Sequence, residues 1–291
     1  MLSVEWKERI RIPLMLAPAM AVVLILYSGG LILALVQSLG YMPILDRYDL
    51  SFDAYIRILQ DDEFLKGLLL TCWIGFSTTI FSSVLAIIGA LVLRQSLRGK
   101  ALVTFIFQFN VPIPHIVGAI AILLFLSQSG MLSRVKYLLD ITKNMVAFPA
   151  FVNDEYAMGI ILEYLWKTST FTGIILLAVL QSIGEDFEDL ARTLGANRWQ
   201  RFQYVILPLI MPGLLRASIL VFAFAFGAFE IPYILGQSFP AALPVVAFNY
   251  YNDIDLNYRA EAMATCIIIA SLITVLIFLY IKLTETFVRA V

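Results

Sequence analysis

Charged side chains are scarce in this 291-residue sequence, at 14% of all residues. A soluble globular domain carries about 25% charged residues. Hydrophobic side chains instead make up 61% of the chain. The composition therefore excludes an ordinary soluble domain and predicts an integral membrane protein. The net charge of −1 gives no sign of nucleic-acid binding, and no nucleic-acid partner is expected.

Cysteine and histidine are almost absent, which limits the chemistry open to the chain. Cys72, Cys266 and the single His115 form no CxxC pair and no Cys/His cluster. We therefore expect neither a disulfide framework nor a metal site. Both cysteines lie in apolar runs, where they are expected as small buried hydrophobes. The sequence also lacks a G-x-x-x-x-G-K-[ST] phosphate loop, so this device for binding ATP is missing.

Long apolar runs dominate the rest of the sequence. Each of six runs reaches about 20 residues, the length at which a helix crosses a hydrocarbon core of about 30 Å. They are Pro13–Val36, Gly67–Leu93, Ala101–Leu126, Ile160–Ile183, Leu214–Leu235 and Ala262–Leu283. Backbone groups in lipid must pair within their own segment, so helices are expected, and the short alternating segments of a β-barrel are missing. We predict an all-α, polytopic membrane protein with six transmembrane helices.

The first run follows three basic residues, as a secretory signal does. Its apolar stretch is too long for a signal, however, and no A-x-A-like cleavage pattern follows it. We therefore expect it to be retained as the first span.

Lysine and arginine set the expected orientation, because positively charged loops stay in the cytoplasm. With the N-terminus inside, the inner side collects Lys7, Arg9, Arg11, Arg94, Arg98, Lys100, Arg192, Arg198, Arg201, Arg216, Lys282 and Arg289. The outer side collects fewer, namely Arg47, Arg57, Lys66, Arg134, Lys136, Lys143 and Arg259. Both termini are therefore predicted to be cytoplasmic, and so is the polar segment 185–208.

That polar segment is patterned as two short helices joined by a turn. Its apolar residues Phe187, Leu190, Ala191 and Leu194 fall at i, i+3, i+4 and i+7, which makes one stripe of a helix. Acids crowd its first turns, where the helix dipole favours them. Gly195 is typical of a helix end, and the residue two positions later, an asparagine, is typical of the start of a second helix.

An amphipathic helix resting on the inner leaflet is the simpler interpretation of this segment. Anionic lipid would repel the clustered acids, however. A helix that only rests on the membrane surface also does not need the sharp turn that Gly195 provides. A docking role toward another protein is therefore favoured.

The spacing from Asp189 to Pro208 resembles the EAA motif of permease subunits in bacterial type I ABC importers, whose pattern is E-A-A-x3-G-x9-I-x-L-P. Asp189-Leu190-Ala191 is followed after three residues by Gly195, and after nine more by Val205-Ile206-Leu207-Pro208. The flanking runs YLWKTSTFTGIILLAVLQSI and PLIMPGLLRASILVFAFAFGAFEIPYILG are similar to spans of the polyamine, iron, thiamine and phosphonate group of this binding-protein-dependent family. The resemblance covers residues 66–287. Asp189 stands for the usual Glu and keeps its charge, whereas Leu190 replaces an Ala and adds bulk.

The resemblance implies a type I importer permease fold in two parts. Residues 1–65 are the first span and an external loop, with a short amphipathic helix expected at Phe52–Leu59. Residues 66–291 are a core of five spans with a cytoplasmic coupling helix at about 185–208. In the family this helix sits in a groove of the ATPase. ATPase-coupling roles therefore fall on Glu188, Asp189, Leu190, Ala191, Leu194, Gly195, Ala196, Leu207 and Pro208.

The resemblance also implies partners and a location. An ABC ATPase dimer, a second permease subunit of the same or another kind, and a periplasmic or extracellular solute-binding protein are expected, besides membrane lipid. ATP and Mg would be used by the ATPase, so this chain would bind no cofactor and would not be an enzyme. The cytoplasmic (inner) membrane is the expected site, with a polyamine, thiamine, iron or phosphonate compound as the candidate substrate.

Ionisable residues inside spans are costly and usually face protein or water. Glu230, before a break expected at Pro232, either lines the substrate path or is structural, pairing with a neighbouring span or lying at the outer headgroups. Asn110 and His115 flank two prolines, and broken helices often border a binding site. The alternative for the lone His115 is a packing residue with its polar atoms satisfied. Glu163 and Lys167, at i,i+4, are expected to form a local ion pair.

Two other functions remain to be weighed. A secondary transporter driven by an ion gradient would need paired broken helices in two matching halves, a pattern not found in the sequence. An intramembrane enzyme would need a nucleophile-base or metal constellation, and His115 has no such partner in the sequence pattern.

Overall fold

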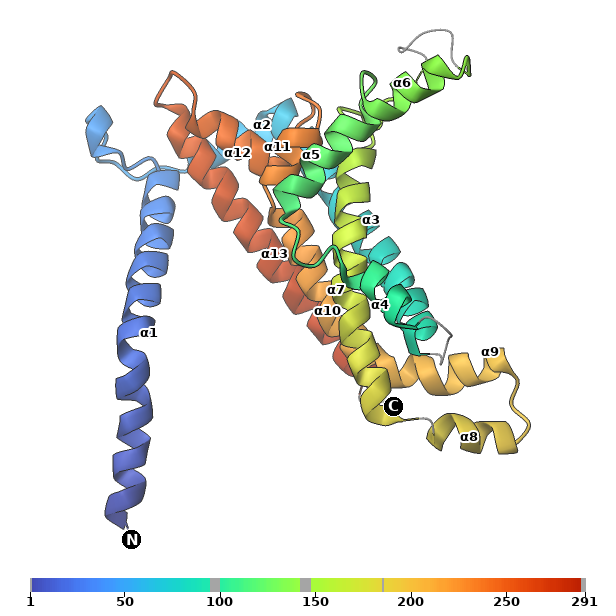
Figure 1. Cartoon of the computed structure of the whole chain (residues 1–291). Helices are drawn as coiled ribbons and strands as arrows, with labels where there is room; N and C mark the ends of the chain where they lie inside the picture. The colour runs from blue at the N-terminus through green and yellow to red at the C-terminus, as the bar shows by residue number, and fades with distance from the viewer. Residues whose placement is uncertain (1, 95–99, 142–147, 185, 289–291) are drawn as a thin grey trace. The chain divides into compact units, whose positions relative to one another are not determined.

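The structure is a computed structural model that describes residues 2–94, 100–141, 148–184 and 186–288. Every regular element within these ranges is a helix, as Figure 1 shows, and one isolated bridge joins Met42 and Arg47. This confirms the all-α prediction. Arg98, Lys143, Glu185 and Arg289, which entered the charge and loop patterns above, lie outside the described residues.

Six segments of the described chain are long and apolar enough to cross a membrane, so the predicted number is confirmed. They are Pro13–Ser38, Asp62–Arg94, His115–Leu138, Met158–Ile183, Arg198–Gly227 and Tyr258–Lys282. The third differs most from its predicted bounds. The run Ala101–Leu126 is not one helix but two, α4 (Lys100–Gln108) and α5 (His115–Leu126).

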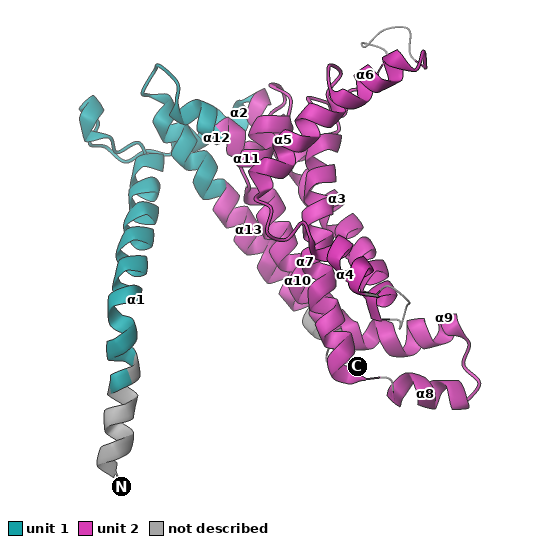
Figure 2. Ribbon diagram, viewed as in Figure 1, with its two compact units in different colours: residues 1–61, 247–268 teal, residues 62–246, 269–291 magenta. Residues whose placement is uncertain are grey.

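The chain divides into two compact units (Figure 2). Unit 1 holds residues 1–61 and 247–268, and unit 2 holds residues 62–246 and 269–291. In chain order the first elements are α1 (Leu2–Ser38), the 3-10 turn η1 (Pro43–Leu45) and α2 (Asp53–Gln60), and the last are α12 (Leu243–Tyr251) and α13 (Tyr258–Val288). The short helix expected at Phe52–Leu59 is confirmed as α2.

Polar contacts hold unit 1 together. Arg57 of α2 donates to Glu261 of α13 at 2.6 Å, and the Ser38 and Tyr55 hydroxyls lie 2.7 Å apart. The Tyr250 hydroxyl donates to Asp61. These bonds tie the segment after α1 to the start of α13.

Unit 2 is built around α3 (Asp62–Arg94), α7 (Met158–Ile183) and α10 (Leu207–Gly227), each of which packs on the other two. Lipid gives helices no hydrophobic drive to associate, so membrane helices pack through small residues that allow close approach. On α3 these include Gly75, Ala86 and Ala90, all buried. The result is a close-packed support for the break between α4 and α5 and for the loop that follows α7.

Candidate functional site

The first region is the break between α4 and α5. Pro112 and Pro114 cause it, because proline lacks the N–H that continues a helix and disfavours helical geometry in the residue before it. α4 therefore ends at Gln108, and α5 begins at His115 with Pro114 as its N-cap. The regular helical bonds are lost across the break, where the Asn110 carbonyl accepts from the Ile113 N–H at 3.1 Å instead, and the carbonyl groups there need further donors.

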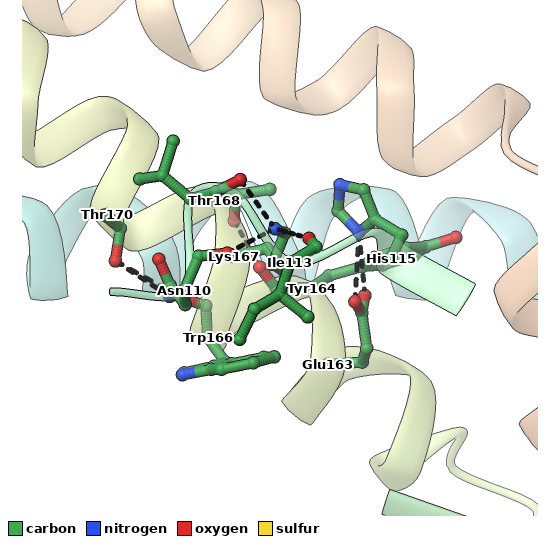
Figure 3. Close-up of polar contacts among 10 residues, drawn as sticks. Asn110, Ile113, His115, Glu163, Tyr164, Trp166, Lys167, Thr168 and Thr170 are labelled. Carbon is green, nitrogen blue, oxygen red and sulfur yellow. Dashed lines mark hydrogen bonds and ion pairs between the residues drawn. The ribbon is translucent and has the colours of Figure 1, made fainter. Parts of the chain in front are cut away.

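Lys167 of α7 supplies those donors (Figure 3). Its Nζ donates to the carbonyl oxygens of Asn110 at 2.7 Å, of Val111 at 3.4 Å and of Ile113. An ammonium group carries three N–H bonds, so these contacts use all of them. Lys167 is thus a cap for the broken helix rather than a free charge.

The side chains of Thr170 and Asn110 add further hydrogen bonds between α7 and the break. Thr170 Oγ1 lies 3.0 Å from the Phe107 carbonyl oxygen, in the last turn of α4. Asn110 Nδ2 donates to the Trp166 carbonyl oxygen at 2.5 Å and to Thr170 Oγ1 at 3.0 Å. The side chain of Asn110 is buried, and its Oδ1 has no partner among the described residues. Asn110 therefore fixes the break to α7.

Close packing of one aromatic ring also holds α4 against α3 and α7. The Phe107 ring lies between Gly89 of α3 and Gly173 of α7, so closely that a Cβ at either glycine would meet it at 2.6 Å. Only glycine leaves room for the ring at these two positions.

His115 and Glu163 form a second bridge between the elements, this time from α5 to α7. His115 Nδ1 lies 3.0 and 3.2 Å from the two carboxylate oxygens of Glu163, whose side chain is 0% exposed. The expected ion pair between Glu163 and Lys167 is wrong. Helical spacing places them on one face, but the carbonyl groups of the break take Lys167, and α5 takes Glu163.

A cavity of about 630 Å³ opens beside the break. Its polar lining residues are His115, Lys167 and Thr168. The others are Val111, Pro112, Ile113, Pro114, Phe171, Ile174, Ile175, Leu220, Val221 and Phe224. Of the three path residues expected from sequence, His115 lines this cavity, whereas Asn110 and Glu230 are not among its lining residues.

Glu230 begins α11 (Glu230–Leu235) and is exposed. The helix break predicted at Pro232, after Glu230, is wrong: the chain breaks before Glu230, because α10 already ends at Gly227. A proline is tolerated in the first turn of a helix, where its missing N–H has no partner to lose. Pro232 therefore sits inside α11 without breaking it.

The second region is the loop segment 186–208, and its predicted structure is confirmed. α8 (Asp186–Thr193) is followed by Gly195 at φ +84°, a left-handed conformation that favours glycine. Asn197 caps α9 (Arg198–Arg201): its side chain accepts a hydrogen bond from the Gln200 backbone N–H at 2.9 Å. In return, the Gln200 side chain accepts one from the Asn197 backbone N–H. The chain enters α10 through one π-helical turn, η3 (Phe202–Ile206).

Pro208 accounts for that π turn. It has no N–H to donate to Tyr204 four residues earlier, and its ring would clash with that carbonyl in a regular helix. The Leu207 N–H donates instead to the Phe202 carbonyl, five residues back. Such single π turns are frequent at functional sites.

Arg94, the last residue of α3, anchors the loop to the membrane helices. It forms a half-buried ion pair with Glu188 of α8 and donates to the Gly184 carbonyl oxygen at the end of α7. Of the other expected coupling residues, Asp189, Leu190, Leu194 and Gly195 are exposed, and Ala191, Ala196, Leu207 and Pro208 are partly buried.

Comparison with known proteins agrees with this architecture. A model of the binding-protein-dependent transport system inner membrane component family matches residues 82–290. The chain is 28% identical over 249 residues to the trehalose/maltose transport system permease protein MalF of Thermococcus litoralis, covering 82% of each chain. It is 26% identical over 230 residues to the molybdate/tungstate transport system permease protein WtpB of Pyrococcus abyssi, covering 78% of this chain and 83% of the relative.

A solved structure has the same fold. A chain of a bacterial ABC transporter involved in the import of the acidic polysaccharide alginate aligns with a TM-score of 0.82, at 19% identity over 98% of both chains. Fold and sequence together define a multi-pass permease subunit of an ABC importer, not an enzyme. The chain belongs to the binding-protein-dependent transport system inner membrane component family. This membership decides against the ion-gradient transporter and the intramembrane enzyme.

Proposed function

We propose that segment 186–208 is the element through which an ATP-hydrolysing partner drives this permease. The observation that carries the proposal is a set of large apolar side chains exposed on a polar loop. Phe187, Leu190, Leu194 and Trp199 are 55%, 61%, 81% and 66% exposed. Large exposed apolar side chains rimmed by polar residues are typical of protein interaction sites. We call these four residues the docking surface.

The rigidity of the loop supports the transmission of force. The ion pair between Arg94 and Glu188 ties α8 to α3, the bond from Arg94 to Gly184 ties the loop to α7, and η3 continues directly into α10. A displacement of the docking surface would therefore move three membrane helices together. A slack linker would absorb the same displacement.

The assembly follows from this role. An ABC ATPase dimer binds ATP and Mg and docks on the cytoplasmic side, where both termini of this chain also lie. A second permease subunit completes the path, and an external binding protein delivers the solute. The excess of lysine and arginine on the loops assigned to the inner side supports this orientation.

The solute path runs beside the break between α4 and α5. Its support is the cavity of about 630 Å³, lined by His115 and by Phe171 and Phe224. Lys167, which also lines this cavity, and Asn110 fix the break to α7 through their hydrogen bonds. A role in the path for Asn110 and Glu230, which do not line the cavity, stays a prediction from the sequence.

The substrate class is a separate proposal. The relatives named above carry trehalose or maltose and molybdate or tungstate, so the family spans sugars and oxyanions. The polyamine, thiamine, iron or phosphonate compound expected from the resemblance stays a prediction. Mass spectrometry of the ligand retained by the cognate binding protein tests it.

Docking itself is tested with Leu194→Asp. Burial of one leucine contributes about 1.5–3 kcal/mol, so a carboxylate at this position should weaken ATPase binding by at least about tenfold. The dissociation constant is measured between the purified ATPase and the permease in lipid nanodiscs. Leu50→Asp is the matched control, because Leu50 is also exposed, at 64%, but lies outside the loop. Equal affinities for the two variants would refute the proposal.

A further inference from the structure

A second recess lies under the same loop. It has a volume of about 240 Å³ and is enclosed by the end of α3, by α8, and by residues of α9 and η3. Its lining residues are Leu91, Arg94, Glu188, Asp189, Arg192, Arg201 and Ile206. We propose that this recess receives a carboxylate side chain of the docking ATPase, with Arg201 as its main ligand. The proposal rests on the proposed function and names a contact that the docking surface alone does not supply.

The recess is lined by three arginines and two acids, so its positive charge is not fully neutralised by its own residues. Arg94 and Glu188 satisfy each other in an ion pair. Asp189, Arg192 and Arg201 form no ion pair with any described residue. One acid thus faces two arginines, and the recess retains an excess of positive charge.

Arg201 also carries an unsatisfied donor. Its Nε is buried, and no described residue accepts a hydrogen bond from it. A buried N–H without an acceptor costs free energy that an incoming acceptor recovers. The planar guanidinium matches a carboxylate in bidentate geometry, which makes a carboxylate the fitting ligand.

An anionic lipid headgroup has similar chemistry, but the surroundings favour a protein. The three acids in the first turn of α8, Asp186, Glu188 and Asp189, would repel a negatively charged membrane surface. The docking surface begins on the same helix, α8, and its exposed apolar side chains would be buried by an apolar surface of a protein partner. An acid on that protein surface would enter the recess as the docking surface is covered.

The test compares Arg201→Gln with Arg198→Gln. Arg198 belongs to the same short helix α9 but is exposed and does not line the recess. We expect Arg201→Gln to weaken binding of the ATPase to the permease in nanodiscs of neutral lipid by about tenfold, as for the loss of a charge-assisted contact. The dependence of affinity on salt should flatten as well. Arg198→Gln should bind like the unaltered chain.

Stability of the free permease is the second measurement. Since Arg201 Nε has no partner to lose, Arg201→Gln should leave the thermal midpoint of the free chain unchanged or raise it. Arg94→Gln, which breaks an existing ion pair, should lower that midpoint. A lowered midpoint for Arg201→Gln would show a structural role and overturn the proposal.

Two further outcomes would also overturn it. Equal affinities for Arg201→Gln and Arg198→Gln, while Leu194→Asp still weakens binding, would support docking through the loop but exclude the recess from it. A loss of affinity confined to nanodiscs containing phosphatidylglycerol would assign the recess to lipid. Failure of Leu194→Asp to weaken binding would instead contradict the proposed function itself.

Discussion

Replacement of Lys167 by methionine is the sharpest test of how the break between α4 and α5 is held. Methionine keeps the length of the side chain but removes all three donors. The carbonyl groups of Asn110, at 2.7 Å, and of Ile113 then lose a charged partner, and the weaker contact to Val111 at 3.4 Å is lost too. Pro114 has no N–H to donate to the Asn110 carbonyl, which keeps only the Ile113 N–H at 3.1 Å.

The expected magnitude follows from the two close contacts. A hydrogen bond from a charged group contributes about 1.5–3 kcal/mol, so two contribute about 3–6 kcal/mol. Lys167 is partly exposed and borders the cavity, so water can replace part of this. We expect the free energy of unfolding to fall by about 2–4 kcal/mol. Tryptophan fluorescence during titration of dodecylmaltoside micelles with SDS measures it.

Lys66→Met is the matched control. Lys66 pairs with Asp62 at 3.1 Å on the exposed start of α3, with the two side chains 48% and 80% exposed. An exposed i,i+4 pair contributes about 0.3–0.5 kcal/mol, so this variant should lose little stability. If the two lysine variants lose equal stability, Lys167 does not hold the break.

Two substitutions test other parts of unit 2. Gly173→Leu places a side chain against the Phe107 ring, which already lies 2.6 Å from the Cβ position, and should cost about 1–3 kcal/mol of unfolding free energy; an unchanged SDS midpoint would contradict the packing of α4. Thr71→Val removes the acceptor of the Leu243 N–H at 2.8 Å and should cost about 1–3 kcal/mol. Amide hydrogen exchange at Leu243 should then be faster, and unchanged exchange would refute the contact.

Local chemistry explains what the sequence predicted well. The asparagine at 197 and the glycine at 195 predicted the cap and the turn of the loop, because each acts within a few residues. The prolines at 112 and 114 mark the place where the third run, predicted as one span, divides into α4 and α5. The error at Pro232 has the same origin. Whether a proline breaks a helix or begins one depends on where the preceding helix has ended, and the packing of α10 decides that.

The polar contacts of the site were not predictable in this way. Lys167 meets the Asn110 carbonyl 57 residues away, His115 meets Glu163 across 48 residues, and Arg94 meets Glu188 across 94. Only the helical spacing of Glu163 and Lys167 was visible in the sequence, and it suggested the wrong pair. The one usable signal was general: each ionisable residue inside a span needs a partner.

Uptake by proteoliposomes tests the central claim most directly. The vesicles contain the permease assembly, with or without the ATPase, enclose Mg-ATP, and receive the cognate binding protein loaded with its own radiolabelled ligand. We predict that uptake requires the ATPase and falls to background with Leu194→Asp, while Leu50→Asp retains it. Uptake that persists without the ATPase and follows an imposed ion gradient would contradict the account.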